Sequence, residues 1–146
     1  MKVMLEEAAF MPTKAHEADA GFDLYSPIDF TIKGNQLQSI HTFEIASATV
    51  DTGVHIAIPF GYVGMVKSKS GLNVKKGLTV EGVVGSGYTG TVVLKFYNHS
   101  KYDYEFKRGE KIAQLVVMPI STESLELVDS LEDTERGDGG FGSTGR

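Results

Sequence analysis

The chain of 146 residues contains no cysteine, which excludes disulfides and every metal site built on thiolates. Tryptophan is absent too, and no run of residues approaches the ~18 apolar positions that a membrane span requires. Histidine is scarce, and no histidine has a partner four residues further on, so a zinc site built from histidines alone is not expected. The four histidines are His16, His41, His55 and His99.

Positive charge is also in short supply. The 14 Lys and Arg against 19 Asp and Glu give a net charge of −5, which argues against binding to a nucleic-acid polymer but leaves room for a small anionic ligand at a local cationic site. Glu6 and Glu7 stand where a secretory signal needs an apolar core. We therefore expect a cytoplasmic protein of one domain, large enough to bury a core, that contacts no membrane.

Short apolar runs separated by turn residues recur along most of the chain. Val54, Ile56 and Ile58 alternate with His55 and Ala57, which predicts a strand with one buried face. No continuous helical period is found, although residues 72–76 fit one short turn of helix. The pattern predicts an all-β fold, a jelly-roll-like double-sheet barrel. Further strand-like runs cover residues 22–26, 29–33, 62–66, 91–97, 111–119 and 125–128.

Two segments depart from this pattern. Residues 38–52 have weak periodicity and fit either an elaborated hairpin or a loop that faces a partner. Residues 129–146 are polar and end in a glycine-rich stretch, a composition that cannot pack a core. We expect a β domain over residues 1–128 followed by a flexible tail over 129–146.

The glycines at 85, 87 and 90 match the dinucleotide-binding pattern G-x-G-x-x-G. That pattern requires a helix to open at its last glycines. Residues 91–97 are instead β-branched and aromatic, as in a strand. The glycines are therefore predicted to lie between two strands, and a Rossmann site is excluded.

Four other stretches carry candidate chemistry, each with an ordinary structural alternative. Lys69 and Ser70 fit a phosphate-binding turn or a solvated basic turn. Asp23 alternates with apolar neighbours and fits a catalytic acid or the partner of a buried cation. Gln114 lies in an apolar run and needs a hydrogen-bond partner from the backbone, another subunit or a ligand. The tail, with Arg136 and Phe141 among glycines, fits a phosphate-binding cover or a disordered end.

Taken in order, these stretches resemble the trimeric dUTP diphosphatase (dUTPase) family over nearly the whole chain. The match rests on five motifs in the family's order, which together are far more specific than any one of them. They are Ala-Gly-Phe-Asp-Leu-Tyr-Ser at 20–26, Lys-Ser-Gly-Leu at 69–72, the segment 82–90, Arg-Gly-Glu-Lys-Ile-Ala-Gln-Leu at 108–115, and Arg-Gly-Asp-Gly-Gly-Phe-Gly-Ser-Thr-Gly at 136–145.

The resemblance implies a β jelly roll that forms a homotrimer and splits dUTP into dUMP and pyrophosphate, with Mg²⁺ held through the triphosphate and not directly by the protein. It implies that the segment 82–90 reads uracil through backbone groups at Gly82 and Val84, and that Tyr88 lies against the deoxyribose, which excludes a 2′-hydroxyl. It implies that Asp23 organises the reaction centre. Contacts to phosphate or base are implied for Lys69, Ser70, Gly71, Gln114, Arg136, Phe141, Gly142, Ser143 and Thr144.

Two positions depart from the family's pattern. Lys69 stands where the family usually has arginine, so the charge is kept and the bidentate fork is lost. Gly85 stands where the family's pattern Gly-x-x-Asp-x-x-Tyr-x-Gly has the aspartate that acts as general base. Loss of a general base typically lowers a rate by about 10²–10⁴-fold, so the resemblance implies reduced or absent turnover.

Three hypotheses follow from these residues. The chain is a dUTPase weakened at Gly85, or one that uses another acid such as Asp23. Alternatively, it binds deoxyuridine nucleotides, or a protein partner that it regulates, without efficient hydrolysis. The third hypothesis, a dCTP deaminase relative of the same fold, ranks lowest because the context of Lys69 and Tyr88 is that of a dUTPase.

Overall fold

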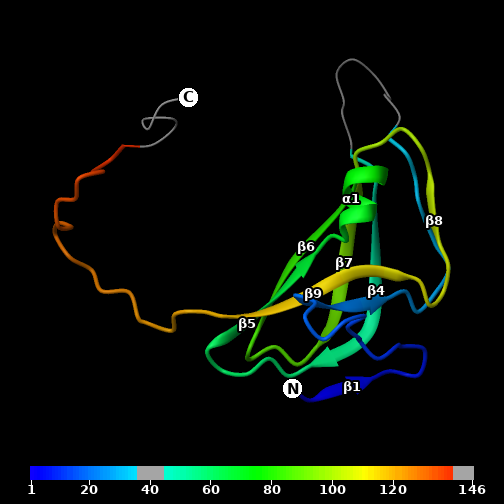
Figure 1. Ribbon diagram of the computed structural model, residues 1–146, viewed down its shortest axis with the longest axis horizontal. Helices are drawn as coiled ribbons and strands as arrows, with labels where there is room; N and C mark the ends of the chain where they lie inside the picture. Colours follow the sequence, from blue (N-terminus) through cyan, green and yellow to red (C-terminus); the bar gives the residue numbers. More distant parts are fainter. Residues whose placement is uncertain (36–44, 140–146) are drawn as a thin grey trace.

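The computed structural model describes residues 1–35 and 45–139. They form an all-β fold, as the sequence predicts, in which antiparallel strands curl around one core (Figure 1). The strands are β1 (Val3–Leu5), β2 (Gly21–Tyr25), β3 (Phe30–Ile32), β4 (Ser47–Ile56), β5 (Tyr62–Lys67), β6 (Leu78–Gly85), β7 (Thr91–Asn98), β8 (Tyr104–Phe106) and β9 (Lys111–Pro119). A single helix, α1 (Ser70–Lys76), follows β5 in the described chain.

Seven of the strands form one sheet in the order β1-β4-β7-β6-β5-β9-β2, and β3 pairs with β8 separately. The alternation that predicts a buried face holds on β4, where Val54 and Ile56 are buried, and continues to Ile58. Phe96 and Phe106 are fully buried and lie against Phe30, with Phe30 and Phe106 stacked, so that one aromatic cluster joins the two sheets.

The short helix agrees with the expectation for residues 72–76. It ends at Gly77, whose backbone adopts the left-handed conformation (φ 68°) and donates to the carbonyl of Asn73. Among the described residues no helix is long and apolar enough to cross a membrane.

The strand β6 is shared between the two halves of the curled sheet. It pairs with β7 only through Leu78–Val80, and with β5 through residues 81–85. The segment 82–90 therefore joins two neighbouring strands, as the sequence predicts, and its two arms diverge beyond the paired residues. The cause is the curl of the sheet, since the core lies between the arms and Val84 and Val92 are both buried in it.

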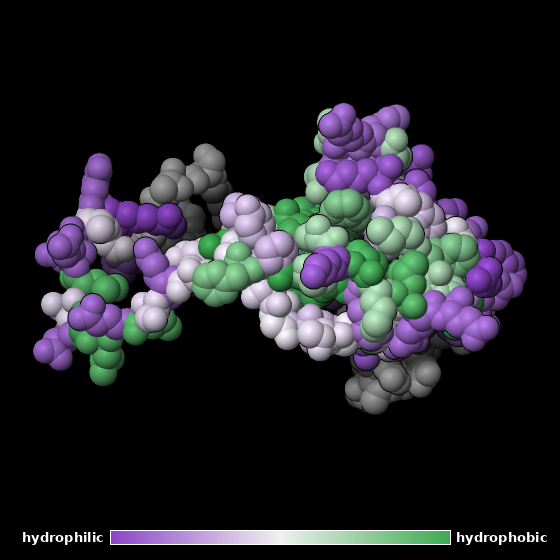
Figure 2. All heavy atoms as spheres, turned by 90° about the horizontal axis from the view of Figure 1, so that it is seen from below, coloured by the Kyte–Doolittle hydropathy of each residue, from purple (hydrophilic) through white to green (hydrophobic). Residues whose placement is uncertain are grey.

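Beyond β9 the described chain contains no helix or strand up to residue 139. The prediction of a strand at 125–128 is wrong, because Leu125 and Leu127 are fully exposed and no neighbouring strand of the described chain lies beside them. Figure 1 shows this part of the chain leaving the body, and Figure 2 shows hydrophobic residues exposed among hydrophilic ones there. Of the segment 38–52, residues 47–52 belong to β4, and much of the remainder lies outside the described residues.

Candidate active site

Asp23 lies at the centre of a cluster of charged side chains. Its carboxylate is 7 % exposed, and it forms an ion pair with Lys69 through Oδ1 and a second with Lys111 through Oδ2, at 2.8 Å. Burial raises the pKa of Asp23, but the hydrogen bonds and charges of Lys111 and Lys69 outweigh burial and hold the pKa below its ordinary value of 3.8. Asp23 is therefore an ionised carboxylate whose two oxygens are both paired with lysines, and such a carboxylate is a weak general base.

Lys111 was not a candidate from the sequence. The Asp23 carboxylate, through its hydrogen bond and charge, raises the pKa of Lys111 above its ordinary value. Because each lysine carries one positive charge and Asp23 one negative charge, the cluster retains a net positive charge for an anion. Only the register of β2 against β9 could have identified Lys111, since it comes from a distant part of the chain.

The strand register places further candidates beside this cluster. Gln114 of β9 lies opposite Asp23 of β2 on one side and opposite Lys67 of β5 on the other. Ser70 and Gly71 follow Lys69 directly at the start of α1 and are both exposed. A Cβ built on Gly71 would meet nothing within 4 Å, so a ligand has room to approach this backbone. The structure thus brings together Asp23, Lys69, Ser70, Gly71 and Gln114.

The remaining candidates of the body lie on the segment 82–90. The Tyr88 hydroxyl donates to the carbonyl of Thr91 (2.8 Å), and the ring covers Gly90, where a Cβ would come within 2.7 Å of the ring carbon that bears the hydroxyl. Glycine at position 90 is therefore required by the Tyr88 conformation. Val84 is buried as a whole residue, and its side chain belongs to the core.

Gly85 ends β6 at the exposed end of this segment. Its backbone does not adopt a positive φ, and a Cβ built on it would meet nothing within 4 Å. The fold therefore does not demand glycine at position 85, and an aspartate would fit without displacing a neighbour.

The two groups of candidates are well separated within one chain. Glu81, Lys67, Gln114 and Asp23 form one row across β6, β5, β9 and β2. Gly85 lies four residues further along β6. It is therefore roughly 13 Å from Asp23 in the strand direction and about 14 Å from it across the sheet. One copy of the chain therefore cannot bring Gly85 and the lysine cluster to the same reacting atom.

The tail candidates are described only in part. Arg136 is exposed and its Nε donates to the carbonyl of Gly139 (2.9 Å) within a local turn. The predictions for Phe141, Gly142, Ser143 and Thr144 fall outside the described residues. No group of three or more histidine, aspartate or glutamate side chains suited to a metal ion occurs in the described ranges 1–35 and 45–139.

The chain is similar in sequence to proteins named deoxyuridine 5′-triphosphate nucleotidohydrolase. The chain is 42 % identical over 145 residues to the deoxyuridine 5′-triphosphate nucleotidohydrolase of Mus musculus, covering 99 % of this chain and 83 % of that protein. It is 38 % identical over 148 residues to the enzyme of the same name from Saccharomyces cerevisiae, covering 99 % and 94 %.

Solved structures agree in fold. The dUTPase of Staphylococcus bacteriophage 80alpha with dUpNHpp superposes with a TM-score of 0.85 at 30 % identity, covering 99 % of this chain and 98 % of that one. A mutant dUTPase from phage phi11 of S. aureus, described with a structural Mg(II) ion, gives a TM-score of 0.77 at 28 % identity, covering 90 % and 98 %. The profile of the family described as dUTPase matches residues 7–145, and the chain belongs to the dUTPase family.

Proposed function

We propose that this protein binds dUTP with Mg²⁺ and hydrolyses it to dUMP and pyrophosphate, at a rate reduced by the glycine at position 85. The membership of the dUTPase family supports the substrate, as does the bound dUpNHpp in the related phage structure. The observation that carries the proposal is a pair of features: a cluster with net positive charge surrounds Asp23, and position 85 offers no carboxylate.

Recognition of the base is assigned to the inner edge of β6. No ladder joins residues 81–85 to β7 in the described chain, so the backbone groups of Gly82 and Val84 on that side pair with no strand, and we assign them to the base. A pyrimidine edge carries donors and acceptors that can pair with such a backbone edge. Tyr88, at the end of the same segment, would then lie against the sugar and select deoxyribose over ribose by steric exclusion.

Recognition of the phosphates is assigned to the lysine cluster. Lys69 supplies a charge, Ser70 a hydroxyl donor, Gly71 an accessible backbone and Gln114 a neutral amide. Asp23 holds Lys69 in place and is a positioning residue in this proposal. The position of Asp23 between two lysines argues against its serving as a substitute base.

The geometry also supports a shared site. Because Gly85 and the Asp23 cluster are far apart within one chain, a nucleotide that contacts both must lie between two copies. We propose the homotrimer of the family, with the segment 82–90 of one subunit facing the lysine cluster of another. The tail from Arg136 onward would close over the nucleotide, with Arg136 pairing with phosphate.

Magnesium fits this site only when it is bound to the nucleotide. The buried carboxylate of the cluster, Asp23, has both oxygens engaged by lysines. Triphosphate oxygens are hard ligands of the kind that Mg²⁺ prefers, and when bound the ion neutralises their charge. The protein's contribution is then the orientation of the nucleotide by Lys69, Ser70 and Gln114.

The absence of a carboxylate at position 85 also favours a second candidate function. In it the chain binds deoxyuridine nucleotides with negligible hydrolysis and regulates a protein partner. The two candidates share the binding site and differ only in turnover.

Two measurements on the unmodified protein separate the candidates: titration with dUpNHpp, and pyrophosphate release from dUTP with Mg²⁺. Saturable binding with slow, Mg²⁺-dependent release supports the impaired enzyme, and binding without release supports the regulatory protein. Failure to bind dUpNHpp rejects both.

A further inference from the structure

The ladder between β4 and β7 is interrupted beside the segment 82–90. Asp51 lies opposite Val93 and His55 lies opposite Thr91, so three residues of β4 face one residue of β7. Gly53, within this bulge, has a positive φ of 65°. A bulge changes the direction of side chains where regular pairing stops. Here it turns side chains of β4 toward the start of β7.

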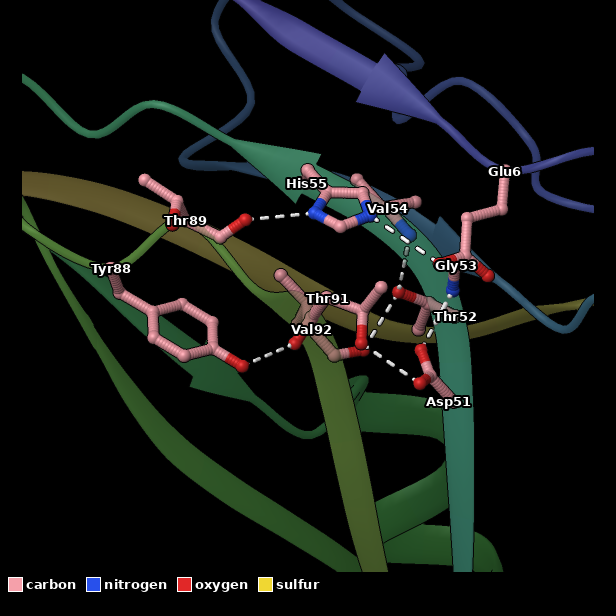
Figure 3. A network of polar contacts seen from close by, with 10 residues as sticks. All are labelled: Glu6, Asp51, Thr52, Gly53, Val54, His55, Tyr88, Thr89, Thr91 and Val92. Carbon is pink, nitrogen blue, oxygen red and sulfur yellow. Dashed lines mark hydrogen bonds and ion pairs between the residues drawn. The ribbon is translucent and has the colours of Figure 1, made fainter.

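Side chains of β4 replace the missing ladder contacts (Figure 3). The Thr52 hydroxyl donates to the carbonyl of Val92 (2.7 Å), and the Thr91 hydroxyl donates to Asp51 Oδ2 (2.8 Å). His55 Nδ1 lies 2.8 Å from the carbonyl of Thr89 and must donate to it, since a carbonyl only accepts. Thr89 precedes β7, so His55 reaches the turn itself and not only the strand.

His55 is held from the opposite side by the N-terminal part of the chain. Glu6 Oε1 lies 3.5 Å from His55 Nε2, and the Glu6 backbone N–H donates to the carbonyl of Gly53 (2.9 Å). Figure 3 shows His55 between Glu6 and Thr89, with Tyr88 next to Thr89. These contacts hold the imidazole in place independently of its hydrogen bond to the turn.

Packing contributes little to the position of the turn. A cavity of about 240 Å³ lies between β1 and the turn, lined by Val3, Met4, Ile56, Tyr88 and Thr89 among others. Residues 85–89 are all exposed. With open space on the inner side and solvent on the outer side, the hydrogen bond from His55 is a main restraint on Thr89. The neighbouring Tyr88 is also held by its own hydrogen bonds, from its N–H to the carbonyl of Gly85 (3.1 Å) and from its hydroxyl to the carbonyl of Thr91 (2.8 Å), so His55 adds the restraint on the far side of the turn.

We propose that His55 is a positioning residue for nucleotide selection: by holding the Thr89 carbonyl it fixes Tyr88 in the place from which the ring rejects a 2′-hydroxyl. This proposal rests on the proposed function, in which Tyr88 lies against the deoxyribose. Loss of one such hydrogen bond is expected to weaken dUpNHpp binding by about three- to tenfold. UpNHpp binding would weaken less, because a mobile Tyr88 also excludes ribose less strictly.

The test compares three substitutions at position 55. The amide nitrogen of asparagine can take the place of Nδ1, whereas that of glutamine takes the place of Nε2. His55→Asn is therefore expected to keep the affinity for dUpNHpp, while His55→Ala and His55→Gln weaken it by about three- to tenfold. The matched control is Thr52→Val, which removes two neighbouring hydrogen bonds at a fully buried position, one donated to the carbonyl of Val92 and one accepted from the N–H of Val54, and leaves the contact to the turn in place.

Titration calorimetry gives the Kd of dUpNHpp and of UpNHpp, and the Kd of UpNHpp divided by that of dUpNHpp measures the preference for deoxyribose. Thermal unfolding gives the Tm of each variant. The proposal expects a smaller ratio for His55→Ala and His55→Gln, and an unchanged ratio for His55→Asn and Thr52→Val. It is overturned by an unchanged ratio in all three His55 variants, or by an equal loss in all three. Where His55→Ala does not fold, His55→Gln carries the comparison. If the unmodified protein does not bind dUpNHpp, the proposed function itself fails, an outcome distinct from failure at His55 alone.

Discussion

Replacing Gly85 with aspartate is expected to raise kcat for dUTP by about 10²–10⁴-fold, the usual contribution of a general base. At about 1.36 kcal/mol for each factor of ten, this lowers the activation free energy by roughly 2.7–5.4 kcal/mol. The fold should accept the change, because a Cβ at position 85 meets nothing within 4 Å and the backbone does not have a positive φ. We expect the free energy of unfolding to change by no more than about 0.5 kcal/mol.

Pyrophosphate release from dUTP with Mg²⁺ measures kcat, and titration with dUpNHpp shows whether the site is retained. Gly85→Asn controls for the shape of the new side chain, and Ser86→Asp controls for the added charge in the same turn. Neither control should raise kcat. The reasoning is refuted if Gly85→Asp binds dUpNHpp but hydrolyses dUTP no faster than the unmodified chain, or if Gly85→Asn is equally effective.

The same contacts support three further predictions. Asp23→Asn leaves Lys69 and Lys111 without their counter-ion, and we expect a loss of about 1–3 kcal/mol in urea unfolding at pH 7, less than for a fully buried pair because both lysines are partly exposed. Because the folded-state pKa of Asp23 lies below 3.8, its contribution is complete above pH 3.8 and disappears as the pH falls through the folded-state pKa; an unchanged acid profile in Asp23→Asn would contradict this. If sites are shared between subunits, mixing Lys69→Ala with Tyr88→Ala and reassembling them restores about a quarter of the dUpNHpp sites, whereas sites confined to one chain give none. Removing residues 136–146 should abolish tight dUpNHpp binding while Tm stays within about 1 °C, since the described residues 136–139 add no core contacts; a large fall in Tm would refute the role as a cover.

The alternation of Val54, Ile56 and Ile58 was enough to predict a half-buried strand, because its period matches the pleat. The same reasoning failed at residues 125–128. An apolar run describes a segment that is able to form a strand, but a strand also needs a neighbour, and none lies beside Leu125 and Leu127 in the described chain.

Features that depend on distant pairing could not be predicted. The divergence of β6 and β7 follows from the curl of the sheet, and both arms have the composition of ordinary strands. Lys111 gained its place beside Asp23 from the register of two strands far apart in the sequence. In the sequence, His55 is one residue of an alternating run. The bulge that turns it toward Thr89 could be suspected only from Gly53.

The most direct test of impaired hydrolysis at this site follows the fate of dUTP bound to the unmodified protein. Excess protein is mixed with dUTP and Mg²⁺, the mixture is quenched at increasing times, and the remaining dUTP is measured beside the fraction bound. We expect dUTP to be bound and then hydrolysed about 10²–10⁴-fold more slowly than by Gly85→Asp in the same experiment. Hydrolysis of bound dUTP as fast as by Gly85→Asp, or no binding of dUTP, would contradict this expectation.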